Sequence, residues 1–345
     1  LGDLNQSHPE VRDELKRWAR WLVTEFNIDI FRLDTASFMP YDFLHELQEA
    51  AGIPIIGEVT ATNLSYHASF QKANATSIID GVLNFPLYYT ASAGFCHTWF
   101  PYATGNLTFL GQRMMEQHEE GLYENVNLLG NFIDNHDVKR VGADCREDKS
   151  RMANAYVFIM SIPGVPIVYY GSEHSFTEQR MSMWSANALG QFWRTGPPYY
   201  LFKAMNLARK ALNLTFGTLE VHETVHYTKD DMPDDHTSLV FSRGARRDVW
   251  VFLNNIHTSD SVTRYCLLTR FPAPDDGKEW LNFFDGKPPV WGDDNCLYTA
   301  TNLPMMFAQH EIGKQPLTAD LHRAYLEEMK EESDPYPDFY KSKQR

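Results

Sequence analysis

The stretch that decides the fold is Ile28-Asp29-Ile30-Phe31-Arg32-Leu33-Asp34, a short apolar run that ends in a carboxylate. Before it, from Pro9 to Phe26, apolar residues recur at helical spacing, and after it a second helical stretch runs from Tyr41 to Ala51. Another apolar run, from Ile53 to Glu58, comes next. A helix between two short buried strands is the repeating unit of a parallel sheet with both faces covered.

The alternation of strand and helix continues to about residue 213. Three further strand-like runs follow at Gly81 to Phe85, Leu128 to Ile133 and Val165 to Tyr170, with a helical segment from Arg151 to Ser161. Beyond Asn213, short runs rich in Val, Thr, Phe and Trp alternate with turn residues, which predicts an antiparallel β-sandwich of about 100 residues. These runs are Leu219 to Tyr227, Ser238 to Arg243, Asp248 to Asn254, Arg264 to Arg270, Trp280 to Phe284 and Leu297 to Phe307.

The composition excludes several classes of protein. Hydrophobic residues make up 43% and charged residues 22% of the 345 residues, which argues against a disordered, collagen-like or low-complexity chain. The 31 basic and 45 acidic residues leave a net charge of −14 without a basic stripe, so we expect no nucleic-acid partner. No apolar run is long enough to span a membrane, so we expect no membrane-spanning helix. The aromatic content of 14% suits a carbohydrate-binding cleft and a large core equally well.

Cysteines and glycosylation sequons indicate the compartment. Cys96, Cys145, Cys266 and Cys296 allow two disulfides, and the last two fall in the predicted sandwich, where they could join two strands. No Cys/His cluster suggests zinc. The five Asn-x-Ser/Thr sequons predict a secreted or lumenal protein, the alternative being a cytosolic protein with chance sequons. They begin at Asn5, Asn63, Asn74, Asn106 and Asn213.

Three carboxylates come at or just after the ends of strand-like runs. Asp34 and Glu58 close the first two runs, and Asp137 follows Phe132-Ile133-Asp134-Asn135-His136. In a barrel of parallel strands the carboxyl ends share one face, where active sites lie. Two such carboxylates can act as nucleophile and acid in retaining glycoside hydrolysis, and a third can stabilise the transition state. Each also has a structural interpretation alone: Asp34 and Asp137 as helix N-caps, and Glu58 as an acid paired with Arg32.

Together these motifs resemble the α-amylase family of glycoside hydrolases, in particular secreted fungal-type α-amylases. The segment Phe31 to Ala36 resembles the one that carries the nucleophile, which implies that Asp34 attacks the anomeric carbon and that Arg32 orients it. The segment Ile56 to Val59 resembles the one that carries the acid/base, here Glu58.

Further segments extend the resemblance. Asn135-His136-Asp137 resembles the segment whose His136 binds sugar hydroxyls and whose Asp137 stabilises the transition state. Arg180, with Trp184, resembles an Arg and Trp pair whose Arg contacts donor-side sugars. Leu1-Gly2-Asp3-Leu4-Asn5 resembles a motif that makes Asp3 a calcium ligand, and calcium is the cofactor the resemblance implies. Ser37-Phe38 replaces a Lys-His pair that contacts acceptor-side sugar, so we expect altered acceptor binding.

The resemblance implies an α/β fold: a (β/α)8 TIM barrel, present only as about strands 4 to 8, followed by an antiparallel β-sandwich. We expect residues 1–213 to be the C-terminal part of the catalytic barrel, 214–312 the sandwich and 313–345 a charged tail whose composition is compatible with disorder. Five strands cannot close an eight-stranded barrel, so we expect a fragment that is inactive alone. An upstream continuation of the reading frame would test this.

The implied activity is retaining hydrolysis of α-1,4-glucosidic bonds in starch or glycogen, by a protein that is a monomer when complete. The partner would be an α-glucan, with no nucleic acid and no membrane. Two alternatives stay open. A transglycosidase or debranching enzyme shares the three carboxylates, and a non-catalytic homologue could have kept the fold.

Overall fold

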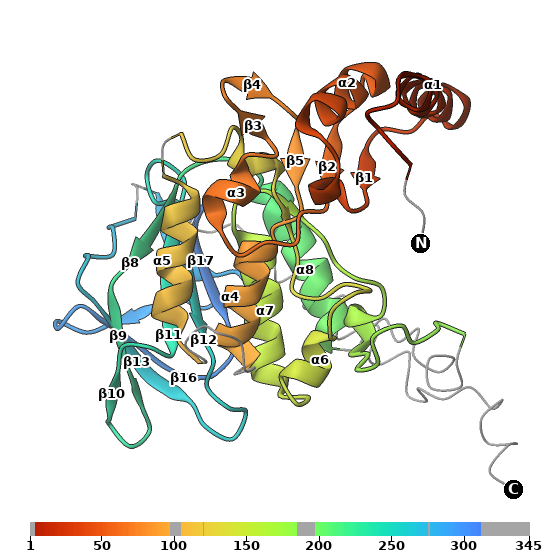
Figure 1. The fold of residues 1–345 in the computed structure, drawn as a ribbon. Coiled ribbons are helices and arrows are strands. Elements are labelled where there is room, and N and C mark those ends of the chain that lie inside the picture. Colours follow the sequence, from red (N-terminus) through yellow and green to blue (C-terminus); the bar gives the residue numbers. More distant parts are fainter. Residues whose placement is uncertain (1–3, 97–104, 120, 185–196, 275–276, 312–345) are drawn as a thin grey trace, which may run out of the picture. The chain divides into compact units, whose positions relative to one another are not determined.

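The computed structural model describes residues 4–96, 105–119, 121–184, 197–274 and 277–311 (Figure 1). The chain forms two compact units, and each is described here by itself. The first comprises Leu1–Tyr89, Arg113–Phe132 and Pro163–Ile167. The second comprises Thr90–Gln112, Ile133–Ile162 and Val168–Arg345.

The first unit is built on parallel strands in sequence order. Strands β1 (Phe31–Leu33), β2 (Ile55–Gly57) and β5 (Gly81–Val82) form one sheet, and β6 (Gly130–Asn131) pairs with β7 (Val165–Pro166). A parallel bridge between Leu83 and Gly130 joins the two groups. Each of the five strand-like runs predicted in residues 1–213 therefore contains a parallel strand. The strands are shorter than the runs because only two or three residues of each make ladder pairs.

Two helices of the first unit have the bounds that the sequence predicts. These are α1 (Pro9–Phe26) and α2 (Tyr41–Ala51), which lie side by side in Figure 1. Arg12 of α1 binds Asp42 and Glu46 of α2 at 2.8 and 2.9 Å. Helix α2 ends at Gly52, whose φ of +66° is the left-handed conformation that glycine adopts without steric cost. Shorter elements follow: α3 (Leu64–Ala68), β3 (Lys72–Ala73) and β4 (Thr76–Ser77).

Buried amides fix the central strands of this unit. Helix α4 (Phe85–Cys96) begins after Asn84, and α5 (Leu107–Gln117) ends at Gln117. The Asn84 side chain donates to Asn131 Oδ1 at 2.8 Å and accepts from Gln117 Nε2 at 2.7 Å, and Asn131 donates to the Pro163 carbonyl. Gly81 is required for close approach, because a Cβ there would lie 2.2 Å from the Leu128 carbonyl oxygen.

The second unit contains the predicted sandwich, as two five-stranded antiparallel sheets. One sheet has the order β14-β17-β12-β11-β8 and the other β10-β9-β13-β16-β15. The strands are β8 (Leu219–His222), β9 (Thr224–Thr228), β10 (Pro233–Asp234), β11 (Ser238–Arg243), β12 (Val249–Asn254), β13 (Val262–Leu267), β14 (Lys278–Asn282), β15 (Val290–Trp291), β16 (Cys296–Thr301) and β17 (Met305–Glu311). Trp250, Phe252 and Tyr265 are wholly buried in the core that these strands form.

Two of the runs in the predicted sandwich each form two strands, which lie in different sheets. Leu219 to Tyr227 divides into β8 and β9 around Glu223, and Leu297 to Phe307 divides into β16 and β17 around Asn302 to Pro304. A strand that crosses from one sheet of a sandwich to the other keeps an apolar pattern through the bend. The pattern alone therefore misses the crossing.

Helices and two disulfides complete the second unit. Besides the C-terminal part of α4 and the N-terminal part of α5, it contains α6 (Val141–Asp144), α7 (Lys149–Ser161) and α8 (Pro197–Ala211). Cys266 of β13 pairs in register with Cys296 of β16 and forms a disulfide with it, which confirms the suggested staple. A second disulfide joins Cys96 to Cys145. Disulfides are typical of proteins in oxidising compartments.

Asp148 connects α7 with the sandwich. It caps α7 by accepting from the backbone of Ser150 and Arg151, and it also accepts from the Thr258 backbone at 3.0 Å and from the Thr258 hydroxyl at 2.9 Å. Burial alone raises the pKa of this carboxyl, but these hydrogen bonds outweigh burial and lower its pKa to about 2. The ionised carboxylate therefore stabilises this junction.

We expect Asp148→Ala to lower the free energy of unfolding by about 2 kcal/mol at pH 7, because the cap and the Thr258 bonds are lost together. As the pH falls, Asp148 is protonated at a higher pH in the unfolded chain than in the folded chain. The stabilisation by Asp148 is therefore complete above about pH 4 and is lost as the pH falls towards about 2. Urea denaturation at pH 7 and pH 2.5 measures it, with the exposed Asp230→Ala as control. If the difference in the free energy of unfolding between Asp148→Ala and wild type were as large at pH 2.5 as at pH 7, the stabilising role of the ionised Asp148 would be contradicted.

The domain limits at residues 213 and 312 stay predictions. The two compact units divide the chain elsewhere, although all strands from β8 to β17 lie between residues 219 and 311. The predicted tail, 313–345, lies outside the described residues. Within the described ranges, no helix combines the length and apolar character needed to cross a bilayer.

Candidate active site

Asp34 and Glu58 lie beside each other at the carboxyl ends of neighbouring strands. Leu33 of β1 is in register with Gly57 of β2, and the Glu58 amide donates to the Leu33 carbonyl at 2.8 Å. Asp34 is the residue that follows β1 and Glu58 the one that follows β2, so the parallel pairing brings both carboxylates to one edge of the sheet. Their surroundings differ. The Asp34 side chain is 69% exposed, whereas that of Glu58 is only 11% exposed.

Arg32 binds both carboxylates. Its Nη1 forms an ion pair with Asp34 Oδ1, and its Nη2 lies 3.2 Å from Glu58 Oε2. A planar guanidinium can hold two carboxylates in a fixed relation, which a lysine ammonium on its flexible stem cannot do. The resemblance implies that Arg32 orients Asp34. The contact between Arg32 and Glu58 agrees with the structural alternative for Glu58, an acid paired with Arg32.

Thr35 contributes a backbone contact that sequence reasoning did not single out. Its amide donates to Glu58 Oε2 at 3.0 Å, so one Glu58 oxygen has two donors. Thr35 has φ +47°, a left-handed conformation that is rare for a β-branched residue. A 3-10 turn, Ala36–Phe38, follows at once. Strained backbone of this kind is often found at functional sites, where the surrounding structure holds it in place.

In the second unit, Asn135, His136 and Asp137 form a tight turn. Asn135 Oδ1 accepts from the Asp137 amide at 2.8 Å and from the Val138 amide at 3.1 Å. This side-chain bond shapes the turn, as Asn commonly does. His136 Nε2 lies 2.9 Å from Asp137 Oδ2, and both side chains are partly exposed. The imidazole and the carboxylate can therefore both reach a ligand from the same turn.

Arg180 binds this turn directly. Its Nη2 lies 2.8 Å from Asp137 Oδ1, and its Nε donates to the His136 carbonyl at 2.9 Å. Gln179 donates to the same carbonyl at 2.9 Å. The resemblance implies a sugar contact for Arg180, which stays a prediction. The structure adds an ion pair between Arg180 and Asp137. Trp184, the predicted partner of Arg180, is 75% exposed.

Asp134 is a buried acid below the turn that sequence reasoning did not select. Its carboxylate accepts from the Val141 amide at 3.1 Å and from the Ser172 hydroxyl at 3.2 Å. Burial raises the pKa of Asp134 to about 6, although the Val141 bond and the nearby Arg140 oppose the shift. The motif Asp134-Asn135-His136-Asp137 contains two acids, and spacing alone could not show which of them is buried.

The described residues do not fit a calcium site. Asp3, the predicted ligand, lies outside them. In the part of the chain that is described, no three His, Cys, Asp or Glu side chains gather in a way that could hold a metal ion. Calcium prefers six to eight oxygen ligands. The calcium expectation stays a prediction, and no step proposed below depends on the ion.

The two residue groups correspond to a known catalytic domain. Asp34, Glu58 and Arg32 belong to the first unit, and His136, Asp137 and Arg180 to the second. All six lie within residues 1–195, which match the family model for the alpha amylase catalytic domain. The chain belongs to the alpha-amylase family. The resemblance based on the motifs is thereby confirmed.

Curated alpha-amylases from fungi resemble the chain over part of their length. It is 30% identical over 217 residues to Alpha-amylase 2 of Schizosaccharomyces pombe, covering 61% of this chain and 35% of that protein. It is 28% identical over 216 residues to the Alpha-amylase of Saccharomycopsis fibuligera, covering 61% of this chain and 40% of that protein. The chain thus spans well under half the length of these two relatives.

Solved structures of alpha-amylases share the fold. The alpha-amylase from Malbranchea cinnamomea superposes with a TM-score of 0.73 at 23% identity, covering 89% of this chain and 61% of that one. The alpha-amylase from Geobacillus thermoleovorans, solved with acarbose, gives 0.69 at 23% identity, covering 90% and 66%. The chain therefore shares, over the part that it covers, the fold of these neighbours, which are TIM-barrel proteins with a C-terminal sheet domain.

Proposed function

We propose that the protein is a retaining glycoside hydrolase that cleaves α-1,4-glucosidic bonds of starch or glycogen. The observation that carries the proposal is the bridge that Arg32 makes between Asp34 and Glu58 at adjacent strand ends. It supports a nucleophile and an acid/base held side by side, which is the arrangement retention requires. The match of residues 1–195 to the alpha amylase catalytic domain supports the substrate class.

In the proposed mechanism, Glu58 donates its proton to the glycosidic oxygen as that bond breaks. Asp34 attacks the anomeric carbon from the opposite side and forms a glycosyl-enzyme ester. Glu58, now a carboxylate, takes a proton from water as the water oxygen attacks the anomeric carbon and releases Asp34. The bonds from Thr35 and Arg32 to Glu58 Oε2 support this role, because they fix the position of the carboxyl group.

Asp137 and His136, which belong to the second unit, are proposed to have the roles that the resemblance implies. Asp137 would bind sugar hydroxyls more tightly in the transition state, where positive charge develops on the sugar ring, and His136 would bind a neighbouring hydroxyl. The ion pair between Arg180 and Asp137 supports a positioning role for Arg180, because the guanidinium fixes one oxygen of the Asp137 carboxylate. We propose that the protein is secreted, which the two disulfides support. That the complete protein is a monomer stays a prediction.

We propose further that β1, β2, β5, β6 and β7 are strands 4 to 8 of the barrel. Among the described residues, β1 pairs only with β2, so its other edge has no strand beside it. Helix α1 also carries Trp18, Trp21 and Phe26, each more than half exposed. Large aromatic side chains of this kind commonly form an interface. Both features support further βα units that pack against this edge.

Phe38 favours a second candidate, transfer of the glycosyl group to another sugar. Its side chain is 79% exposed and lies four residues after Asp34. An aromatic ring near the nucleophile could stack on an acceptor sugar and so compete with water for the glycosyl-enzyme.

Product analysis on maltoheptaose separates the candidates. Hydrolysis should release shorter maltooligosaccharides as the α-anomer, followed by proton NMR before mutarotation. Products longer than maltoheptaose would favour transfer, and initial release of the β-anomer would exclude the retaining mechanism. No product from a chain that carries the complete barrel would favour the non-catalytic alternative.

A further inference from the structure

The hairpin of β3 and β4 presents one of the glycosylation sequons at its tip. The sequon Asn74-Ala75-Thr76 spans the turn, because Ala73 pairs with Thr76 across it. Asn74 and Ala75 have φ of +48° and +65°, the two positive values of a type I′ turn, in which asparagine is favoured. Figure 1 shows the two strands as a separate hairpin beside β5.

Buried residues fix the base of this hairpin. Gln71 and Ile78 are 1% and 3% exposed, and the Ile78 amide donates to the Gln71 carbonyl at 2.8 Å. The four residues from Asn74 to Ser77 are all exposed. The turn is therefore anchored at its base while its side chains stay in solvent, where a glycosylated asparagine has to lie.

The two acceptor side chains of this sequon are not used by the fold. Among the described residues, neither the Asn74 side-chain amide nor the Thr76 hydroxyl makes a hydrogen bond. At three other sequons the asparagine oxygen accepts a backbone amide at 2.8 to 3.0 Å, which holds the side chain against the backbone. These asparagines are Asn5, Asn63 and Asn106.

Two of the other sequons are also closed by packing. In Asn106-Leu107-Thr108 the middle residue is fully buried, and the hydroxyl donates to the Asp235 carbonyl. In Asn213-Leu214-Thr215 the middle residue is 1% exposed, and the hydroxyl accepts from Arg209 at 3.4 Å. In both, the hydroxyl that defines the acceptor sequence is bound within the folded chain.

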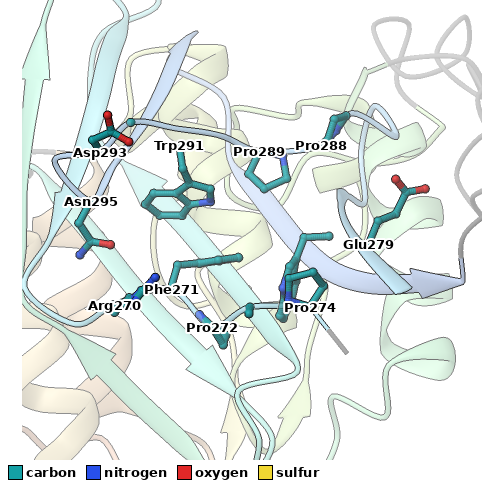
Figure 2. Close-up of a pocket in the computed structure, with 13 residues that line it drawn as sticks. Arg270, Phe271, Pro272, Pro274, Glu279, Pro288, Pro289, Trp291, Asp293 and Asn295 are labelled. Atoms are coloured by element: carbon teal, nitrogen blue, oxygen red, sulfur yellow. The ribbon is translucent and has the colours of Figure 1, made fainter. Parts of the chain in front are cut away.

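A left-handed asparagine is not by itself an acceptor. Asn295, which lines the cavity in Figure 2, also has a positive φ, of +59°. Its Nδ2 donates to the Leu267 carbonyl at 2.6 Å, and Leu297 stands where a sequon needs a hydroxyl. The turn at Asn74 differs in both respects, because its amide has no such bond to a described residue and Thr76 supplies the hydroxyl.

We propose that Asn74 carries an N-linked oligosaccharide, in preference to Asn106 and Asn213. The donor is an oligosaccharide joined through a diphosphate to a polyprenyl lipid. Asn74 Nδ2 forms a bond to the anomeric carbon of the first sugar and loses one of its two protons. The bond between that carbon and the diphosphate breaks, and the diphosphate leaves with the electron pair. That the chain meets this donor rests on the proposed secretion.

The modified turn lies away from the candidate acids of the first unit. The hairpin leads into β5 at the amino end of that strand, and β5 is parallel to β2. Asp34 and Glu58 instead follow the carboxyl ends of β1 and β2. An oligosaccharide at the turn can therefore extend into solvent without covering these acids.

The test is a map of the occupied sequons in the full chain, expressed in yeast behind a secretory leader. Digestion with peptide N-glycosidase in water enriched in the heavy oxygen isotope converts each occupied asparagine to a labelled aspartate. Asn74 and Asn106 lie in one tryptic peptide, so tandem mass spectrometry after reduction compares them directly. We expect Asn74 to be occupied in at least about three times as many molecules as Asn106.

Two neighbouring substitutions identify the acceptor. Thr76→Ala removes the hydroxyl of the sequon and leaves Asn74 in place, and we expect it to abolish the label at Asn74. Ser77→Ala is the matched control, because Ser77 is also exposed on β4 but lies outside the sequon. We expect Ser77→Ala to keep the label, and Thr76→Ser to keep it as well, since that variant still has a hydroxyl.

Occupancy of Asn74 no higher than that of Asn106 would overturn the proposal, and so would a label that persists in Thr76→Ala. The leader supplies entry into the secretory pathway. A missing label at Asn74 therefore counts against this site and not against the proposed secretion. The readout requires no turnover, so a failure of the proposed hydrolysis leaves the test intact.

Discussion

Asp34→Asn is expected to reduce starch hydrolysis by at least about 10³-fold, because the variant loses the nucleophile that forms the covalent intermediate. The exchange keeps the size of the side chain, and the amide can still contact Arg32. Stability should therefore change little. The measurement is kcat/KM on soluble starch, in a chain that carries the complete barrel. Asp29→Asn is the control, because Asp29 is an exposed acid five residues earlier in the same segment.

Azide distinguishes a lost nucleophile from general damage. With α-maltotriosyl fluoride and azide, Asp34→Ala should give β-maltotriosyl azide, because azide displaces fluoride in one step with one inversion. The azide occupies the space of the missing carboxylate. Formation of the α-azide by this variant would contradict the role of Asp34, since that product requires two inversions.

Glu58→Gln is expected to lower starch hydrolysis by about 10²- to 10⁴-fold, the usual contribution of a positioned acid/base. The amide still accepts hydrogen bonds from Thr35 and Arg32, but it cannot supply a proton. Formation of the glycosyl-enzyme from α-maltotriosyl fluoride should fall much less, because fluoride departs without protonation. The exposed Glu25→Gln is the control and should retain wild-type activity.

The ratio between the two substrates is the decisive readout for Glu58. A structural role would lower starch and fluoride reactions equally. With azide, Glu58→Ala should form α-maltotriosyl azide, because azide attacks the glycosyl-enzyme and makes the second inversion. The β-azide from this variant, or equal losses on both substrates, would show that Glu58 is not the acid/base.

Local pattern was sufficient for the elements of the first unit. Helices α1 and α2 begin and end at the predicted residues, because Pro9 and Gly52 provide a start and a stop that are local chemistry. The strands were predicted by place but not by length. Their length depends on which residues find a ladder partner, and Ile28 and Asp29 have none in the described sheet.

The candidate site was predictable where it depends on strand ends. Asp34 and Glu58 follow neighbouring parallel strands, and strand order alone places them together. The partners of Asp137 were not predictable in the same way. Arg180 lies 43 residues further along the chain, and only the folded loop brings its guanidinium to the Asp137 carboxylate. The burial of Asp134 likewise depends on Ser172, which is 38 residues away.

By itself, the sequence determined the class of fold, the parallel order of the first strands and the candidate acids, because these follow from periodicity and from the residues at strand ends. Only the tertiary structure decided that Arg32 binds both acids, where two apolar runs cross between sheets, and which sequons are closed by packing. These features depend on contacts between residues far apart in the chain, whose geometry is set by packing. A local sequence pattern does not indicate such contacts.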